Sequence, residues 1–154
     1  MNGSTVEPLC ADAKTTASNP QLTSDGLALV KLAARTIEEA TDASADGDGI
    51  HTMGAAVRTE DGLTFVGVNL FHFAGGPCAE LVALGAARAA GARQVADIVA
   101  VGNGGRGVCA PCGRCRQVFV DYYPDLRVIV PTGGGPRSVL ASELLPGAYR
   151  AGGL

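Results

Sequence analysis

Two short stretches, Gly75-Gly76-Pro77-Cys78-Ala79-Glu80-Leu81 and Pro111-Cys112-Gly113-Arg114-Cys115, decide how the rest of the chain is organised. Together they supply three thiolates and one free carboxylate. Three protein ligands suit a catalytic zinc ion, because they leave the fourth tetrahedral position for a water molecule whose pKa the metal lowers. Glu80 follows the first cysteine by two residues, where it cannot easily bind the same metal but can reach that water. The predicted zinc ligands are Cys78, Cys112 and Cys115, with Glu80 as the proton carrier.

Both stretches are predicted to begin helices, since the first cysteine of each follows a proline and precedes residues that favour helix. Unpaired amide groups in a first helical turn favour a negative group, so each thiolate is partly stabilised before zinc binds. The three-residue spacing of Cys112 and Cys115 places both sulfurs on one helical face. The sequence therefore predicts that two helix starts share one metal ion.

Zinc base deaminases bind their metal through two cysteines and either a histidine or a third cysteine at the first ligand position, with a glutamate that does not bind the metal. The chain resembles the cytidine deaminase superfamily, and within it is most similar to the blasticidin S deaminases. The resemblance extends over residues 25–150. The matching segments are 67–73, 75–81, 102–103, 106–107, 111–117 and 143–146.

This resemblance implies a fold, an activity and an assembly. The implied fold is α/β, a three-layer α/β/α domain around a five-stranded mixed sheet. The implied reaction is zinc-dependent hydrolytic removal of the C4 amine of a cytosine nucleoside, with one Zn²⁺ per subunit of a homotetramer. Two alternatives stay open: a cytidine or deoxycytidine deaminase of pyrimidine salvage, and a non-catalytic structural zinc-binding module. A structural site normally closes the fourth position with another Cys or His, which the Glu80 pattern does not provide.

The resemblance also assigns substrate contacts. Asn69 matches an asparagine that contacts the substrate sugar in the family. Cytidine deaminases usually continue this motif as Asn-x-Glu, whereas here Phe71 stands in the place of the glutamate. An apolar ring cannot accept hydrogen bonds from ribose hydroxyls, so a blasticidin S-type aminoacyl nucleoside, and hence antibiotic resistance, is favoured over ordinary cytidine. His72 and Ala79 are further candidate pocket residues, and His72 is also weighed as a metal ligand or as a plain loop residue.

Charge balance predicts a cation near the metal. Three thiolates and hydroxide around Zn²⁺ sum to a negative charge, which would raise the pKa of the bound water. Three-cysteine cytidine deaminases commonly place an arginine directly after Cys-Ala-Glu, but this chain has Leu81 there. Arg114 and Arg106 are the candidates to compensate the charge instead.

Composition limits the class of protein. A chain of 154 residues with 47% hydrophobic and 18% charged residues is long enough for one globular domain. The net charge of −3 argues against a nucleic-acid surface, and no apolar run approaches the ~18 residues of a membrane span. The partner is therefore expected to be a small molecule, and the resemblance implies that it is a nucleoside. The start is not expected to be a secretory signal. Three of the five cysteines lie within residues 109–115, which suits metal-bound thiolates in a reducing, cytoplasmic setting better than a disulfide framework.

The remaining segments are predicted by pattern. Residues 1–22 are expected to form a flexible arm in which Cys10 is an exposed thiol, and residues 23–150 to form the deaminase domain. A core-packing helix is predicted from Ser24, with Leu27, Val30, Ala34 and Ile37 on its buried stripe. Asp61-Gly62 between apolar runs predicts an antiparallel hairpin of strands 52–58 and 63–70.

The second half is predicted to alternate helices with strands. A helix over 78–91 between the strand at 63–70 and a strand at 97–102 predicts a crossover with a parallel pair. The glycine-rich segment 103–111 is interpreted as a loop that forms a lip of the pocket. The expected later elements are a helix from Cys112, a strand at 126–130 and a short helix near 142–145 that starts at Ser138.

Cys109 leaves a choice. With Cys112 and Cys115 it opens a ferredoxin-type cluster motif, but Phe119 stands where the fourth cysteine would be. We interpret Cys109 as a buried thiol that binds no metal. A redox-active Cys-x-x-Cys at 112–115 is the other alternative, and it leaves Cys78 and Glu80 unexplained.

Overall fold

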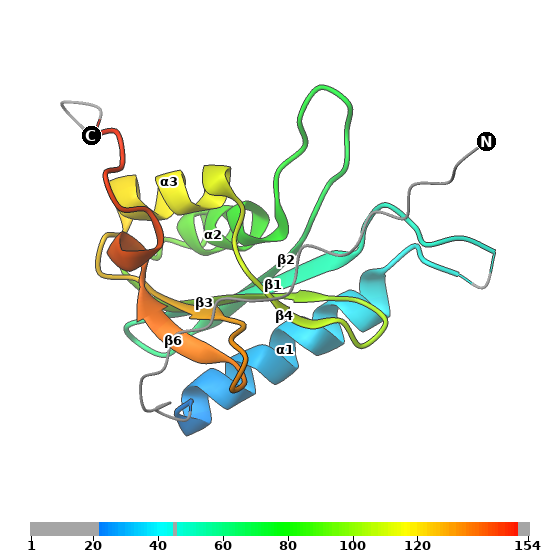
Figure 1. Cartoon of the computed structure of the whole chain (residues 1–154), viewed down its shortest axis with the longest axis horizontal. Helices are drawn as coiled ribbons and strands as arrows, with labels where there is room; N and C mark the ends of the chain where they lie inside the picture. The colour runs from blue at the N-terminus through cyan, green and yellow to red at the C-terminus, as the bar shows by residue number, and fades with distance from the viewer. Residues whose placement is uncertain (1–21, 45, 151–154) are drawn as a thin grey trace.

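Residues 22–44 and 46–150 are described here from a computed structural model, shown in Figure 1. A mixed sheet lies between α1 on one face and α2 with α3 on the other (Figure 1). The predicted three-layer α/β/α fold is thus confirmed. The elements are α1 (Ser24–Ala40), β1 (Met53–Thr59), β2 (Thr64–Val68), α2 (Ala79–Ala89), β3 (Val95–Gly102), β4 (Gly107–Cys109), α3 (Gly113–Tyr122), β5 (Arg127–Val130), β6 (Arg137–Leu140) and the 3₁₀-helix η1 (Ala141–Leu144).

The sheet follows the order β2-β1-β3-β5-β6. Only β3 and β5 pair in parallel, while the other neighbours along this path are antiparallel. The four strands predicted by position are present, β6 is the fifth strand of the implied five-stranded mixed sheet, and β4 adds a sixth. It pairs with β3 at Ala100–Gly102, just beyond the part of β3 that β5 covers. The glycine-rich segment predicted as a loop therefore contains a short strand.

Two core clusters lie on opposite faces of the sheet. Alternate residues of one strand serve different clusters, since side chains of a strand point to opposite faces. On β1, Ala55 packs under α2 and α3, whereas Ala56 packs against α1. The cluster under α2 and α3 includes Phe119 and Cys115, both with 0% exposure. The core on this face thus reaches the first turn of α3.

Helix α1 begins at the predicted place, and its predicted buried stripe is confirmed in part, because Ile37 is fully buried and Val30 and Ala34 are partly buried against the core. The Thr23 side chain caps it by accepting a hydrogen bond from the Gly26 amide at 3.1 Å. Leu27 is 49% exposed, so its predicted place in the core is wrong. The buried residues are Gly26, Leu29, Ala33 and Ile37.

A glycine on β1 explains which face of α1 is buried most deeply. A Cβ atom on Gly54 would lie 2.8 Å from the Ala33 carbonyl oxygen and 2.8 Å from the Ile37 Cβ atom. The missing side chain therefore lets α1 approach the strand along its Ala33–Ile37 face. The 3.6-residue pattern alone leaves a choice between neighbouring stripes when apolar residues occupy both.

The hairpin and both cysteine helices form as predicted, with bounds that differ by one to two residues. β1 and β2 are antiparallel, and Gly62 adopts a positive φ of 86° in the turn between them. The crossover needs a correction, because β1 lies between β2 and β3, which are therefore parallel but not adjacent. Ser138 lies within β6, so it does not start the last helix, which is the 3₁₀-helix η1.

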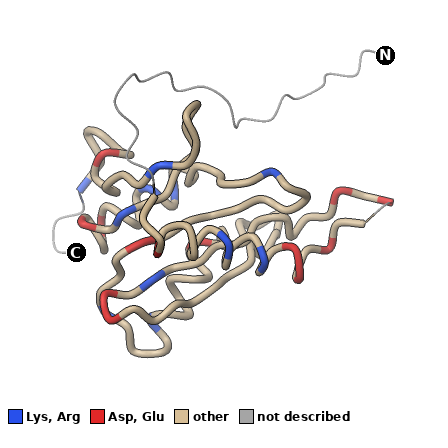
Figure 2. The backbone as a smooth tube through the Cα atoms, turned by 90° about the horizontal axis from the view of Figure 1, so that it is seen from below, with Lys and Arg blue, Asp and Glu red and all other residues tan. Residues whose placement is uncertain are grey.

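The predicted arm, including Cys10, lies outside the described residues except for Leu22. Figure 2 shows acidic and basic residues interspersed along the described part of the chain. Within that part, the helices are all too short or too polar to span a bilayer.

Candidate metal centre

The three cysteines of the predicted metal site lie at the starts of two helices. Cys78 is the N-cap of α2, Cys112 is the N-cap of α3, and Cys115 lies in the first turn of α3. Both N-cap residues have extended backbones, with φ of −65° and −68°. Both thiols therefore lie at helix N-termini, where they can reach a shared partner.

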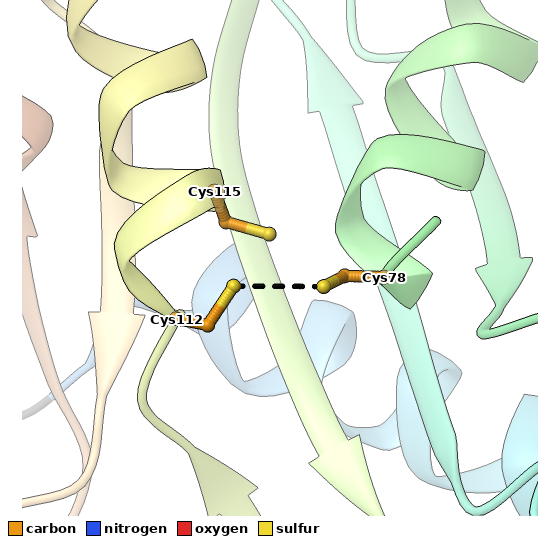
Figure 3. Close-up of side chains that lie close together, drawn as sticks. All are labelled: Cys78, Cys112 and Cys115. Carbon is orange, nitrogen blue, oxygen red and sulfur yellow. Dashed lines mark hydrogen bonds between the residues drawn. The ribbon is translucent and has the colours of Figure 1, made fainter. Parts of the chain in front are cut away.

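The sulfur atoms meet in a compact group. All three lie within 4.8 Å of one another, and the Cys78 and Cys112 sulfurs are 3.5 Å apart. Figure 3 shows the three side chains pointing toward one another from α2 and α3. Sulfurs bound to one tetrahedral zinc at 2.3 Å would be separated by about 3.8 Å. The donor set therefore fits a zinc-sized ion without rearrangement of the helices.

Burial makes this thiol group costly to ionise without a cation. Burial is the main cause that raises the pKa of Cys78 and of Cys115, and nearby negative groups raise both further. Burial also acts against ionisation of Cys112, but the backbone amide of Cys115 and the neighbouring thiols outweigh it and lower its pKa. Three thiolates so close together need a positive ion between them, and zinc supplies one.

Glu80 lies next to the sulfurs and is almost fully buried. It is the second residue of α2 and is 6% exposed. Burial raises the pKa of its carboxyl group, and the helix backbone and the Cys115 thiol offset part of this rise. A carboxyl group with a raised pKa binds a proton more readily than an exposed one, which suits a residue that accepts and returns protons. The prediction that Glu80 carries protons is compatible with this environment.

Close packing of α2 on β2 brings the first turn of the helix to the sheet edge. A Cβ atom on Gly67 would lie 2.5 Å from the Ala83 amide nitrogen and 2.7 Å from the Ala79 carbonyl oxygen. Only glycine at this position lets the helix backbone lie directly on the strand. The substrate candidate Ala79 is fully buried at this contact. The positions of Cys78 and Glu80 therefore depend on a residue in a different element.

The two candidate cations lie in different places. The Arg114 Nη1 atom donates to the Gly76 carbonyl oxygen at 3.2 Å and so links the start of α3 to the segment before Cys78. Arg106 donates instead to the Thr52 carbonyl oxygen at 2.6 Å and to the Asn103 side chain at 2.7 Å. Neither partner of Arg106 belongs to the cysteine stretches. The hydrogen bonds thus favour Arg114 over Arg106 as the cation beside the metal site.

Asn69, directly after β2, is hydrogen-bonded to the chain at the start of β1. Its side-chain oxygen accepts from the Met53 amide at 2.9 Å, and its side-chain nitrogen donates to the Ile50 carbonyl oxygen at 3.0 Å. A carboxamide has two donor hydrogens and two acceptor lone pairs, so one of each remains for a ligand. Asn69 is therefore held in place with hydrogen-bonding capacity to spare.

Phe71 and His72 lie on the loop between β2 and α2, which extends from the body of the domain (Figure 1). Phe71 is 62% exposed, and the next aromatic residue, Phe73, is 91% exposed. The His72 Nδ1 atom accepts from the Ala74 amide at 3.1 Å, inside the loop. The candidate metal-binding group within the described residues does not include His72, so the alternative that His72 is a metal ligand is not supported.

Cys109 lies outside the metal-binding group. It is 7% exposed on β4 and pairs with Ala100 of β3, which belongs to the core under α2 and α3. Its thiol contacts the Gly107 carbonyl oxygen at 3.6 Å. This position agrees with the interpretation of a buried thiol rather than a cluster ligand.

One polar pair between α1 and β1 was not recognised from the sequence. The Asp42 carboxylate accepts hydrogen bonds from the Ile50 amide at 2.9 Å, the His51 amide at 2.8 Å and the His51 ring at 2.9 Å. The His51 amide and ring are the main cause that lowers the pKa of Asp42 to about 2. Because the two residues are nine positions apart in an irregular segment, no periodic signal could reveal the pair.

The known proteins that this chain resembles are named as deaminases of cytidine or of blasticidin S. No protein-family model matches the chain. A blasticidin-S deaminase from Bacillus cereus is 33% identical over 111 residues, which cover 66% of this chain and 79% of that protein. A cytidine deaminase from Halalkalibacterium halodurans is 39% identical over 103 residues, covering 64% and 77% respectively. The crystal structure of a cytidine deaminase from Burkholderia pseudomallei matches with a TM-score of 0.65 and 36% identity, over 83% of this chain and all of the other.

Proposed function

The chain belongs to the cytidine deaminase superfamily, and on this premise we propose that it removes the C4 amine of a cytosine nucleoside by hydrolysis. The observation that carries the proposal is the group of three sulfurs within 4.8 Å, next to the buried carboxyl group of Glu80. The relatives named for this reaction and the structural match to a cytidine deaminase support it.

Cys78, Cys112 and Cys115 would hold one Zn²⁺ ion, since soft thiolate ligands at a tetrahedral spacing select this metal. When bound, zinc supplies a Lewis acid that lowers the pKa of water enough to provide a nucleophile at neutral pH. Arg114, through its bond to the Gly76 carbonyl oxygen, is positioned to offset the excess negative charge of three thiolates.

Glu80 performs the proton transfers in this proposal. Its carboxylate accepts a proton from the attacking water and passes it to the ring nitrogen N3, which makes C4 more electrophilic. It then collects the second proton from the new C4 hydroxyl and delivers it to the amine, so that ammonia leaves and the C4 carbonyl forms. Burial supports this cycle, because it raises the carboxyl pKa toward the value at which both transfers are fast.

We further propose a blasticidin S-type aminoacyl nucleoside as the substrate and antibiotic resistance as the role. Phe71, which follows the Asn69 position by two residues, has no atom that accepts a hydrogen bond from a ribose hydroxyl. The Bacillus cereus relative carries the name of this activity. The competing proposal is cytidine or deoxycytidine deamination, which the Halalkalibacterium halodurans relative supports.

A structural zinc module is the proposal from a different class. Such a site is usually closed by a fourth Cys or His, whereas the metal-binding group within the described residues has three members. Holding Glu80 at 6% exposure also costs free energy that a purely structural site would not need. Both features favour the catalytic proposal.

The assembly and setting are also proposals. We propose a cytoplasmic homotetramer formed by the domain of residues 23–150. Exposed apolar side chains on the loop before α2 support association, since contiguous apolar surface commonly marks an interface. They are Leu70 (56%), Phe71 (62%) and Phe73 (91%). Sedimentation at several protein concentrations tests the tetramer, and a monomer at all of them would contradict it.

The decisive experiment measures ammonia release from a panel of blasticidin S, cytidine, deoxycytidine and cytosine, together with the zinc content of the purified protein. We expect one zinc per chain and the highest kcat/KM with blasticidin S. A higher kcat/KM with cytidine would favour the salvage proposal. Stoichiometric zinc without ammonia from any of the four compounds would favour the structural module.

A further inference from the structure

Arg116 lies directly after the third cysteine and folds back over the start of its own helix. Its Nε atom donates to the Pro111 carbonyl oxygen at 2.8 Å, and its Nη1 atom donates to the Leu144 carbonyl oxygen at 3.1 Å. The side chain is half-buried, and none of the ion pairs found among the described residues involves it. The guanidinium fork is therefore used to join two backbone segments, one just before Cys112 and one in η1.

The orientation of the Pro111 carbonyl group directly affects the backbone position of Cys112. The ring of Pro111 fixes its own φ, and its carbonyl oxygen shares a rigid peptide plane with the Cys112 amide. A hydrogen bond to that oxygen restricts the remaining rotations on either side of the plane. Once the plane is fixed, the direction of the Cys112 side chain depends on few remaining torsions.

Cys112 needs this control more than the other two cysteines do. Cys115 is fully buried in the core and Cys78 is half-buried, whereas Cys112 is exposed. Its sulfur lies 3.5 Å from the Cys78 sulfur and near the backbone amide of Cys115, without core packing around it. Core packing thus fixes the buried sulfur, while the exposed one depends on the backbone that carries it.

The C-terminal segment holds Arg116 and the rest of α3 at three successive places. Besides the Leu144 contact, Gln117 donates to the Tyr149 carbonyl oxygen at 2.8 Å, and Arg150 donates to the Val120 carbonyl oxygen at 2.7 Å. Figure 1 shows this segment, in red, next to α3. Only the first of these contacts connects to the residue before Cys112. The other two act on the middle and the far end of the helix.

We propose that Arg116 is a positioning residue for the metal centre, which fixes Cys112 by holding the Pro111 carbonyl group against the C-terminal segment. This inference rests on the proposed zinc site. It predicts that the fork of Arg116, and not merely the attachment of the C-terminal segment to α3, sets the metal affinity. Arg150 provides the matched control, because it makes the same kind of side-chain to backbone contact at the opposite end of α3.

The experiment compares Arg116→Gln and Arg150→Gln in the full chain. Zn²⁺ affinity is measured by competition with a chelator, the visible spectrum of the Co²⁺-loaded protein reports coordination geometry, and thermal unfolding is followed without metal. We expect Arg116→Gln to lower Zn²⁺ affinity about tenfold and to change the Co²⁺ spectrum, as for other residues that orient ligands. We expect Arg150→Gln to keep wild-type affinity and spectrum, with a comparable loss of thermal stability.

Unchanged affinity and spectrum in Arg116→Gln, or equal changes in both variants, would overturn the inference. Arg116→Lys covers the case in which the glutamine variant does not fold. A single ammonium lacks the planar fork that spans both carbonyl groups, so the lysine variant should still show weakened Zn²⁺ affinity. A lysine variant that matches the wild type would count against the role of the fork. If the wild type itself binds neither Zn²⁺ nor Co²⁺, the proposed metal site fails, and this result is distinct from the others.

Discussion

The helix starts that carry the cysteines and the loop that leads into Cys78 differ in what holds them. We refer to Cys78, Glu80, Cys112 and Cys115 as the metal half of the candidate site and to residues 69–77 as the loop half. In the metal half, Glu80 and Cys115 are buried by the core of the domain. In the loop half, Phe71 and Phe73 are 62% and 91% exposed.

This difference indicates how the site is completed. The metal half is preorganised by packing that the chain supplies itself, because α2 lies directly on β2 at Gly67. The loop half presents apolar side chains that the described part of the same chain does not cover. Such side chains gain free energy when a substrate or a second subunit covers them. Substitutions should therefore affect chemistry in the metal half and selectivity or association in the loop half.

The largest effect is expected from Cys78→Ala, which removes one of the three proposed metal ligands. A site with two thiolates loses both affinity and the geometry that zinc requires, so bound metal and turnover should both be lost. Elemental analysis and ammonia release measure the two outcomes. Cys109→Ala is the matched control, since Cys109 is also buried but lies outside the group, and it should keep both. Full zinc occupancy in Cys78→Ala would contradict the assigned ligands.

Glu80→Gln tests the division of labour inside the metal half. The amide keeps the shape of the side chain but cannot shuttle protons, so turnover should fall by about 10²–10⁴-fold while zinc content is unchanged. Steady-state kinetics and elemental analysis of the same sample measure this. Glu39→Gln, at an exposed position near the end of α1, should leave both values as in the wild type. A variant that retains most of its turnover would remove Glu80 from its role.

Arg114→Ala tests whether a cation between the two halves stabilises the metal. Loss of the contact with the Gly76 carbonyl oxygen and of the positive charge should lower zinc affinity by about tenfold or more. Chelator competition measures the affinity. Arg106→Ala is the control, because the bonds of Arg106 go to Thr52 and Asn103. If the Arg106 variant lost metal and the Arg114 variant did not, the assignment would be reversed.

Phe71→Glu tests the selectivity assigned to the loop half. A carboxylate here can accept hydrogen bonds from ribose hydroxyls, so kcat/KM for cytidine relative to blasticidin S should rise about tenfold, the value of one modest charged hydrogen bond. Competition between the two substrates measures the ratio. Leu70→Glu adds the same charge one position earlier, at a residue that is 56% exposed, and should not change the ratio. Equal ratios in both glutamate variants would show that charge, and not position, matters.

The smallest effect is expected from Asp42→Asn, in the segment between α1 and β1. The pKa of Asp42 is lowered from 3.8 to about 2, so its charged form stabilises the folded state above the ordinary value. This contribution is lost as the pH falls from 3.8 to about 2. The difference in Tm between wild type and variant should be small, because the pair is exposed. It should be constant above pH 5 and become smaller near pH 3, where the Asp42 carboxylate begins to take up a proton. Thermal unfolding at several pH values measures it, and a difference that grows on acidification would contradict the assignment.

Local rules predicted the elements that carry the candidate site residues. A proline before each N-cap cysteine and the Asp61-Gly62 turn set the starts of α2 and α3 and the hairpin without reference to distant residues. Strand β4 was not anticipated, because a three-residue strand with a glycine at its start has no periodicity to detect.

Contacts between distant segments could not be predicted in this way. The bonds from Arg114 to Gly76 and from Arg116 to Leu144 join residues 38 and 28 positions apart. A long charged side chain can reach many carbonyl groups, so its partner depends on which segments the fold brings together. The place of Leu27 in α1 was mispredicted for the same reason, since the missing side chain of Gly54 on another element favours burial of the Ala33–Ile37 face.

Local sequence signals, each a few residues long, place the candidate groups, which are three thiols and one carboxyl group, within the first turns of two helices. The tertiary fold brings the two helix starts together, buries Glu80 beside Cys115 and leaves the loop with Phe71 and Phe73 exposed. These two kinds of feature differ in the sequence range of the interactions behind them. Helix starts and turns depend on neighbouring residues, whereas convergence and burial depend on how α2 and α3 pack on a shared sheet, which no local pattern encodes.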